Sequence, residues 1–125
     1  MQNSWSILVA SGRLENRKAL TRILEGLPVE VFCSRTIEQS SEVFGNRSIQ
    51  IVFSDTTFAD GSYRDLLALA GPKTRFILTI EPWEIDLFDI HAAQIFDFLK
   101  YPMESTDVEL VIIRAARDSV SLTAA

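Results

Sequence analysis

Asp55 is the residue of this sequence whose type and position are best suited to chemistry. It follows the apolar stretch IQIVFS (49–54), and an Asp-Gly pair, Asp60-Gly61, comes five residues later. A carboxylate just past a buried strand can be a reactive group at the end of a sheet. It can also be a hydrogen-bond acceptor that closes the strand, and the side chains around it decide between these two roles.

Other polar residues also stand where apolar stretches end. Thr79 closes RFILTI (75–80), and it is either a functional hydroxyl or a β-branched residue that finishes a strand. The only histidine, His91, reads as a surface residue of a helix. The sequence has no Ser-His-Asp arrangement, glycine-rich phosphate loop or metal-ligand cluster. An ordinary enzyme therefore has little support, and we expect no catalytic residues and no cofactor.

Composition favours one globular domain without a nucleic-acid or membrane partner. The chain has 125 residues, is 47% hydrophobic and carries a net charge of −5, which disfavours a nucleic-acid surface. Arg17, Lys18 and Arg22 read as the solvated face of a helix. Cys33, the single cysteine, is expected to pack as a small apolar group in a reducing compartment. The apolar runs are too short for a membrane span, so we expect a cytoplasmic protein.

Apolar runs typical of strands recur along the chain. They are SILVA (6–10), VEVFCS (29–34), IQIVFS (49–54), RFILTI (75–80) and IFDFL (95–99). Three are almost continuously apolar, as in parallel strands covered on both faces, whereas the second alternates like a strand nearer an edge. Asp60-Gly61 is predicted to be a turn, with Gly61 supplying a backbone conformation that other residues avoid.

Segments with helical period separate these runs. In the first, Leu20, Ile23, Leu24 and Leu27 form one apolar stripe. Thr36 with Gln39 has the pattern of a capping box, and Gly71-Pro72 stops a third helix. Two more helices are predicted near residues 83–93 and 105–120.

Five strands that alternate with five helices predict a doubly wound α/β fold. The five-stranded sheet should be parallel with helices on both faces, and residues 1–125 should form a single domain with its core at about 5–120. In such folds the functional residues lie beyond the carboxyl ends of the strands. Those ends carry Ser11 and Gly12, Asp55, Thr79, and the run from Lys100 to Pro102.

The order of these pieces resembles the receiver domain of bacterial two-component response regulators. ILVASGRLENRKALTRILEG resembles the first strand and helix, and IVFSDTTFADGS the third strand with its phosphate-accepting aspartate. FILTI resembles the fourth strand with its terminal Thr or Ser. FDFLKYPM resembles the fifth strand, which in that family ends in Lys-Pro. The resemblance spans nearly the whole chain and implies the flavodoxin-like strand order 2-1-3-4-5.

The resemblance also implies roles for individual residues. Asp55 takes the phosphoacceptor position, Thr79 the hydroxyl that contacts the phosphoryl group, and Phe98 the aromatic switch position. Tyr101-Pro102 parallels a peptide bond that is usually cis in the family. The flavin-binding alternative within flavodoxin-like folds is disfavoured, because SGRLEN lacks the run of Ser, Thr and Gly donors that would hold a phosphate.

Two chemical elements of the family pattern are missing. Ser11 and Gly12 stand where two acidic residues normally hold Mg²⁺, which leaves Asp55 as the only nearby anionic ligand apart from Glu15, a weak substitute. Tyr101 aligns with the family's lysine. Lys100, one residue earlier, should point away from Asp55 unless a bulge turns it. We therefore expect Mg²⁺ binding to be weak or absent.

The last two helices have more apolar residues than one sheet face can cover. Val108, Val111, Ile112 and Ala115 form the natural core stripe of the fifth helix, which leaves Leu110 and Ile113 on its far side. In the fourth helix, apolar residues lie on both sides. Either these helices pack closely on each other, or they expose an interface, and we favour an interface. Its predicted residues are Trp83, Leu87, Phe88, Leu110 and Ile113.

The favoured hypothesis is an atypical receiver that acts by protein–protein contact, with impaired phosphotransfer. Its partner is expected to be a histidine kinase, an effector domain or a second copy in a homodimer through the fourth and fifth helices. The alternative is a competent receiver that accepts phosphate on Asp55 through an altered site.

Overall fold

The computed structural model describes the backbone of residues 5–87 and 95–124, and the side chains of residues 5–84 and 95–118. Five strands form the central sheet: β1 (Trp5–Ala10), β2 (Val29–Ser34), β3 (Ile51–Ser54), β6 (Arg75–Ile80) and β7 (Ile95–Lys100). Their spatial order is β2-β1-β3-β6-β7, and each neighbouring pair is parallel. This is the predicted order 2-1-3-4-5, and the predicted fold class is confirmed.

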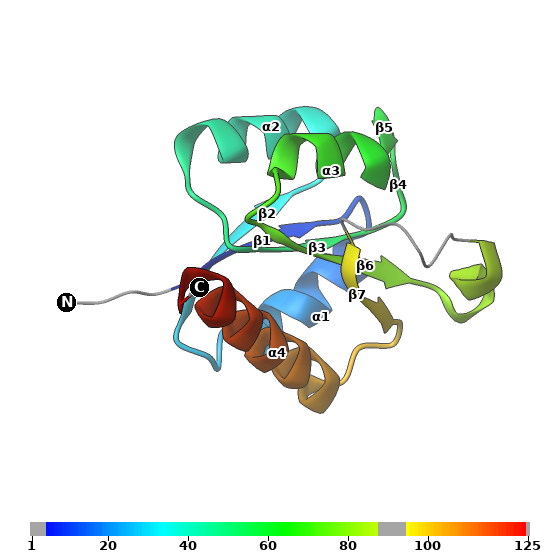
Figure 1. The fold of residues 1–125 in the computed structure, drawn as a ribbon. Coiled ribbons are helices and arrows are strands. Elements are labelled where there is room, and N and C mark those ends of the chain that lie inside the picture. The colour runs from blue at the N-terminus through cyan, green and yellow to red at the C-terminus, as the bar shows by residue number, and fades with distance from the viewer. Residues whose placement is uncertain (1–4, 88–94, 125) are drawn as a thin grey trace.

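Helices cover both faces of the sheet (Figure 1). α1 (Leu14–Leu24) and α4 (Ser105–Ala124) lie on one face, and α2 (Ile37–Asn46) and α3 (Tyr63–Ala70) lie on the other. Side chains alternate across each strand, so each face of the sheet has its own apolar cluster. Within the described residues, no helix is long and apolar enough to cross a membrane.

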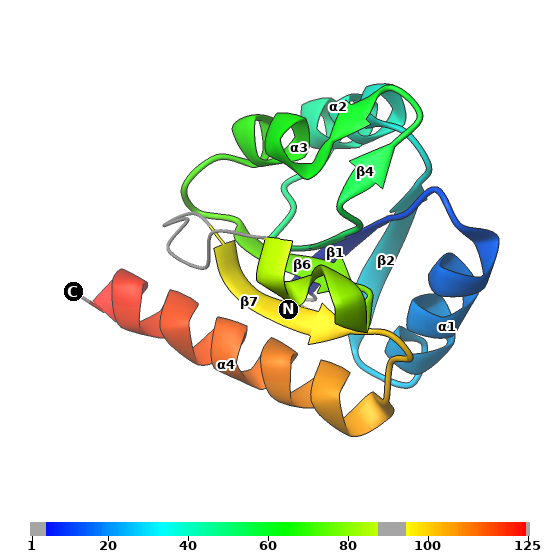
Figure 2. The same ribbon diagram turned by 90° about the vertical axis from the view of Figure 1, so that its right-hand side faces the viewer.

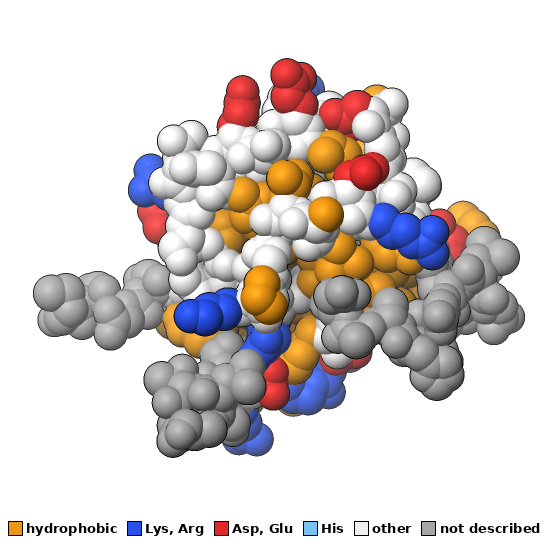
Figure 3. Space-filling model, turned by 45° about the horizontal axis from the view of Figure 1, so that its top comes forward, with side chains coloured by type: hydrophobic (Ala, Val, Ile, Leu, Met, Phe, Trp, Pro, Cys, Tyr) orange, Lys and Arg blue, Asp and Glu red, His pale blue; other side chains and the backbone are white. Residues whose placement is uncertain are grey.

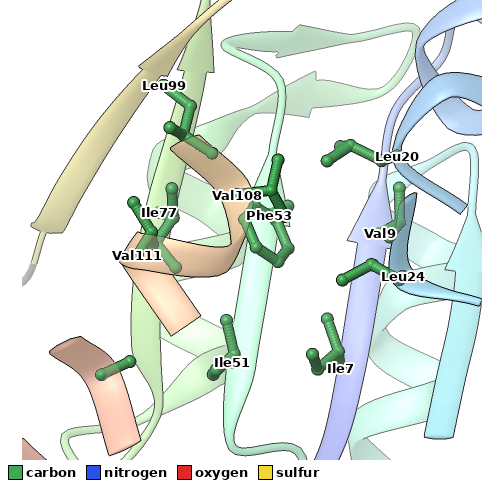
Figure 4. Close-up of a cluster of buried hydrophobic side chains, with 11 residues drawn as sticks. Ile7, Val9, Leu20, Leu24, Ile51, Phe53, Ile77, Leu99, Val108 and Val111 are labelled. Carbon is green, nitrogen blue, oxygen red and sulfur yellow. The ribbon is translucent and has the colours of Figure 1, made fainter. Parts of the chain in front are cut away.

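The cluster under α1 and α4 forms as the helical stripes predict (Figure 4). Leu20 and Leu24 of α1 face Ile7 and Val9 of β1, and Phe53 lies at the centre. In α4, three of the four predicted core residues, Val108, Val111 and Ala115, are buried, and the fourth, Ile112, is partly buried. Burial of each large apolar side chain stabilises the fold by about 1.5–3 kcal/mol, which fixes both helices on this face.

The cluster under α2 and α3 is covered less completely. Leu8, Val52, Phe76 and Leu78 are fully buried in it. Figure 3 looks onto this face, with hydrophobic side chains visible at its centre and acidic side chains along its upper edge. Several apolar side chains of this layer are only partly buried, among them Phe44, Phe58 and Leu67.

Helix ends follow the sequence signals with one difference. Thr36 caps α2 by accepting a hydrogen bond from the Gln39 backbone N–H at 3.1 Å, but the Gln39 side chain accepts from the Arg35 N–H instead of completing the predicted capping box. The complete capping box lies at α3, between Ser62 and Asp65. Gly71, with φ of 82°, ends α3 as predicted.

Glycine is required at position 61, but for a different physical reason from the one predicted. It lies in a short antiparallel pair, β4 (Thr57–Phe58) with β5 (Gly61–Ser62). Gly61 does not have a positive φ. It is required for space, because a Cβ there would overlap the Asp65 carboxylate and lie 3.2 Å from Ile37 Cγ1. The Asp60 carboxylate accepts hydrogen bonds from Ile37 N and Glu38 N, and so caps the start of α2 from a distant loop.

Two further predictions need correction. A 3₁₀ helix, η1 (Pro82–Leu87), stands where the fourth α-helix was expected to begin, and the rest of that segment, with His91, lies outside the described residues. Cys33 is exposed on β2 and does not pack as a core residue. β2 is an edge strand, and its alternate side chains are therefore less covered than those of inner strands.

Candidate functional site

Asp55 lies where the carboxyl ends of four strands come together. It follows β3, and its backbone N–H donates to the Ala10 carbonyl of β1 at 3.0 Å. Ser11 follows β1, Thr79 lies near the end of β6 and Tyr101 follows β7. Because the strands are parallel, these residues converge at one end of the sheet. Asp55 is only 8% exposed there.

Three hydroxyl groups surround the Asp55 carboxylate. Ser11 Oγ donates to Oδ2 at 2.5 Å. Thr79 Oγ1 and the Tyr101 hydroxyl each donate to Oδ1 at 2.7 Å. Hydrogen bonds to an ionised acceptor are short and strong, so the buried charge is stabilised without a counter-ion. Among the described residues, no lysine or arginine hydrogen-bonds this carboxylate.

Tyr101 is held as a neutral donor. Burial raises the pKa of its phenol far above the ordinary value of 10.0, and the negative charge of Asp55 raises it further. Its oxygen also lies 3.1 Å from Thr79 Oγ1. At neutral pH the side chain therefore donates a hydrogen bond to Asp55 but brings no positive charge, which a lysine at this place would bring.

The two other candidate residues at the end of β7, Lys100 and Phe98, do not hydrogen-bond Asp55 as Tyr101 does. Lys100 is exposed and forms the last pairing of β7 with Ile80 of β6. β7 does contain an irregularity, but it lies near Ile95 and Asp97, so it does not turn Lys100 toward Asp55. Phe98 is half-buried against the α2 and α3 cluster. The Tyr101-Pro102 peptide bond is cis.

A pocket of about 50 Å³ opens above Asp55. It is large enough for ordered water but much smaller than the roughly 300–1,000 Å³ of sites that take drug-sized ligands and cofactors. A flavin therefore has no room beside Asp55. Polar side chains for which the sequence predicted no role at this site also line it: Arg13, Asn16, Thr56, Glu81 and Glu84.

Glu81 and Glu84 correct the expectation that Asp55 is the only nearby carboxylate. Glu81 forms an ion pair with Arg13 at 2.5 Å, across the pocket between the β1–α1 and β6–η1 connections. Glu84 accepts from the Thr56 hydroxyl at 3.0 Å and from the Glu81 N–H at 2.8 Å. The position of Glu81, directly after a strand that ends beside Asp55, was the available sequence signal.

The donor set beside Asp55 does not fit Mg²⁺. This ion needs near-octahedral oxygen ligands and one or two free carboxylates. Ser11 donates its hydroxyl to Asp55, Gly12 has no side chain, and the Glu81 and Glu84 carboxylates already have partners. Within the described ranges, no group of three or more acidic, histidine or cysteine side chains could hold a metal ion. Glu15 is exposed on α1 and does not line the pocket.

The expected interface residues whose side chains the structure describes lie on α4 and on η1. Leu110 is 48% exposed and Ile113 is 46% exposed on the side of α4 away from the core, and Trp83 in η1 is 71% exposed. Leu110 borders a shallow cleft of about 330 Å³ between α4 and the end of β7. The side chain of Leu87 and all of Phe88 lie outside the described part of the chain.

Comparison with solved structures connects this arrangement to known folds. The signal receiver domain of an HD domain-containing protein from Pseudomonas fluorescens Pf-5 superposes with a TM-score of 0.85, at 21% identity over 95% of this chain and 99% of that chain. A response regulator receiver domain protein from Clostridium thermocellum gives a TM-score of 0.83, at 22% identity over 94% and 98% of the two chains. This chain has the receiver-domain fold.

A third receiver domain, the CheY-like protein from Methanospirillum hungatei JF-1, gives a TM-score of 0.82, at 18% identity over 95% of this chain and 98% of that chain. Neither a protein-family model nor a curated protein matches the sequence. The receiver fold is therefore shared at low sequence identity, and the chemistry has to be argued from the residues around Asp55.

Proposed function

We propose that this chain is an atypical receiver domain of a two-component signalling system. It acts as a protein–protein interaction module, and its Mg²⁺-dependent phosphotransfer is impaired. The observation that carries the proposal is the hydrogen bonding of Asp55, whose two oxygens accept from Ser11, Thr79 and Tyr101. The role needs no catalysis and no cofactor.

Electrostatics support impaired phosphotransfer. A phosphoryl group that approaches an ionised aspartate meets like charge, which bound cations normally offset. Here the position of the family's lysine is taken by neutral Tyr101, and Arg13, which lines the pocket, is paired with Glu81. The Asp55 oxygen that attacks phosphorus would also have to give up its hydroxyl donors. Each of these features raises the barrier to phosphorylation.

The exposed apolar residues support a role in binding. Trp83, Leu110 and Ile113 are large side chains that the domain leaves accessible, the first on η1 and the other two on α4. The proposed partner is a histidine kinase, an effector domain or a second copy of the chain. An effector in the same polypeptide is compatible with one structural match, NtrX from Brucella abortus, since the match spans 97% of this chain but 28% of that one.

Uptake of phosphate from a small donor tests the proposal. The wild-type chain is incubated with acetyl phosphate and millimolar Mg²⁺, and the phosphorylated fraction is measured by intact-mass spectrometry. We expect no more product than with Asp55→Asn, which keeps the shape of the side chain but removes the nucleophile. Stoichiometric, Mg²⁺-dependent phosphorylation of the wild type alone would reject impaired phosphotransfer.

A competent phosphoacceptor is the second candidate. It is favoured by the contact between Asp55 and Thr79 at 2.7 Å, the pair that the resemblance assigns to the phosphoryl group. The two additional carboxylates of the pocket, Glu81 and Glu84, could be released from their partners to serve as ligands. The same phosphate experiment distinguishes this candidate, because it predicts product that is lost in Asp55→Asn.

A further inference from the structure

A cleft runs along the free edge of β2, on the opposite side of the sheet from β7 and α4. It has a volume of about 910 Å³, and residues of α1, β2 and α2 line it. Figure 2 shows α1 and α2 on either side of β2. β2 itself contributes Phe32, Cys33 and Ser34 to its lining, and the helices contribute polar and charged side chains. We call this surface the β2-edge cleft. It is distinct from the Asp55 pocket and from the exposed residues of α4.

The strand in this cleft has backbone groups that can accept another strand. The Ser34 carbonyl accepts from Ser11 N at 3.0 Å, so Ser34 directs its backbone groups toward the inner side of the sheet. Neighbouring residues of a strand direct these groups to opposite sides. Val31 and Cys33 therefore turn their N–H and C=O groups toward the cleft. No described residue pairs with that edge of β2, which is the last strand of the sheet.

Charge is distributed unevenly around this edge. Three arginines line the cleft, Arg17, Arg35 and Arg47, against one carboxylate, Glu42, so the lining carries a net charge of +2 (three minus one) in a chain whose total is −5. None of the three arginines forms an ion pair within the described residues, whose salt bridges involve other arginines. Concentrated positive charge on an acidic protein favours an anionic partner.

The two walls offer different contacts to an added strand. On the α2 side, Phe32 and Val43 provide apolar surface, and the Arg47 guanidinium lies 5.1 Å from the centre of the Phe32 ring. On the α1 side lie Arg17 and Cys33, the latter 3.6 Å from the Thr21 hydroxyl. The side chains of an added strand alternate between the two walls. One set faces the α2 side, where acidic residues meet Arg47 beside the Phe32 ring, and the other set faces the α1 side with Arg17 and Cys33.

We propose that the β2-edge cleft binds an extended acidic polypeptide segment of a protein partner, which adds to the sheet as a strand beside β2. The backbone groups of Val31 and Cys33 pair with the segment, and Arg35 and Arg47 bind its carboxylates. β2 has six residues, so a segment of similar length, about 20 Å, occupies the whole edge.

Fluorescence anisotropy tests the proposal with the full chain. The probe is a fluorescein-labelled ten-residue peptide of alternating Asp and Val, at about 100 mM salt so that screening is moderate. We expect saturable binding that weakens at least about tenfold when Lys replaces Asp in the peptide. It should weaken similarly for the double variant Arg35→Glu with Arg47→Glu, because like charges then face each other. Lys73→Glu reverses an exposed charge elsewhere, so its affinity should stay within about twofold of the wild type.

Two further measurements separate strand addition from simple charge attraction. A peptide methylated on alternate backbone nitrogens loses its donors on one edge and should bind at least about tenfold more weakly. In the wild-type chain, saturating peptide should slow amide exchange at Val31 and Cys33, a result that does not depend on any variant folding. The proposal is overturned if the acidic peptide does not saturate, if charge reversal or methylation leaves its affinity unchanged, or if exchange at Val31 and Cys33 is unaltered. A ten-nucleotide thymidine strand that binds as tightly as the peptide would also overturn it, and would identify a phosphate-binding surface instead.

Discussion

The Tyr101 hydroxyl donates a 2.7 Å hydrogen bond to the Asp55 carboxylate, 46 residues away in the sequence. Receiver domains resemble this chain in having a residue from the end of the last strand beside the acceptor aspartate, and that residue is normally a lysine. A phenol provides the contact without the charge. The three hydroxyl donors stabilise an ionised Asp55, and among the described residues no lysine or arginine hydrogen-bonds this carboxylate.

Removing this hydroxyl should destabilise the fold. In Tyr101→Phe, a nearly buried carboxylate loses one of three donors, and hydrogen bonds to charged groups contribute about 1.5–3 kcal/mol. Because Tyr101 is only partly buried and water can compensate in part, we expect the free energy of unfolding to fall by about 1–2 kcal/mol, measured by urea denaturation. The loss should be smaller in an Asp55→Asn background, where the acceptor is neutral. Equal losses in the two backgrounds would show that Tyr101 acts by packing alone.

Alkaline pH should weaken the fold through the same residue. Burial and the Asp55 charge raise the pKa of Tyr101 in the folded chain above its unfolded value of 10.0. Above pH 10 the unfolded state therefore binds fewer protons than the folded state. The contribution of Tyr101 to the free energy of unfolding is complete below pH 10 and decreases as the pH rises further. Urea denaturation at pH 9 and pH 11 should show a smaller decrease in Tyr101→Phe than in the wild type. An equal decrease would mean that other groups cause the alkaline loss.

Mg²⁺ should bind the wild-type chain only in the millimolar range or more weakly, because Ser11 and Gly12 supply no carboxylate. The double variant Ser11→Asp with Gly12→Asp should bind at least about tenfold more tightly, since each charged ligand contributes on the order of 1–3 kcal/mol. Gly12 has no positive φ, and a Cβ there would meet only the Arg35 carbonyl at 3.8 Å, so the backbone accepts a side chain.

Isothermal titration calorimetry at near-physiological salt measures this difference. Ser11→Ala is the control, because it removes the hydroxyl donor to Asp55 without adding charge, and it should not gain affinity. Wild-type binding as tight as about 0.1 mM would contradict the assignment of an incomplete metal site.

Asp60 should make the start of α2 sensitive to acid. Its hydrogen bond from the Ile37 N–H is the main cause that lowers the pKa of this carboxylate below 3.8; desolvation acts in the opposite direction, and the bond from the Glu38 N–H lowers the pKa further. The unfolded state then binds protons more readily, so the stabilisation is complete above pH 3.8 and is lost as pH falls through the lower folded value. Thermal unfolding between pH 3 and pH 6 should show a shallower pH dependence for Asp60→Asn, which still accepts hydrogen bonds but does not titrate. Identical slopes would exclude Asp60 as a contributor.

Self-association, if the partner is a second copy, should depend on the exposed face of α4. Ile113→Glu places a charge on a residue that is 46% exposed and lies outside the core stripe, so the fold should persist while any dimer dissociates. Sedimentation velocity at several concentrations measures this. Leu69→Glu, at a 40% exposed leucine of α3, is the matched control and should leave association unchanged. A wild-type chain that stays monomeric at high concentration would exclude self-association through α4.

Local sequence patterns were sufficient to predict the strands of this protein and the side of α4 that faces the core. The apolar runs of the inner strands and the stripe of Val108, Val111 and Ala115 depend only on neighbouring residues and on the period of each element. The position of Asp55 at the end of β3 followed from the same patterns, whereas the strand order came from the resemblance to receiver domains.

The tertiary structure decided which polar side chains contact one another around Asp55 and at the start of α2. That Tyr101 reaches Asp55, that Glu81 pairs with Arg13, and that Asp60 caps α2 depend on the paths of loops which join residues far apart in the sequence. The exposure of Cys33 likewise depends on β2 standing at an edge with no strand beside it among the described residues. Composition and periodicity predict which face of a helix or strand is buried in the core. They carry no information on which polar side chains meet across two loops, because hydrogen-bond geometry is fixed only when the whole backbone is in place.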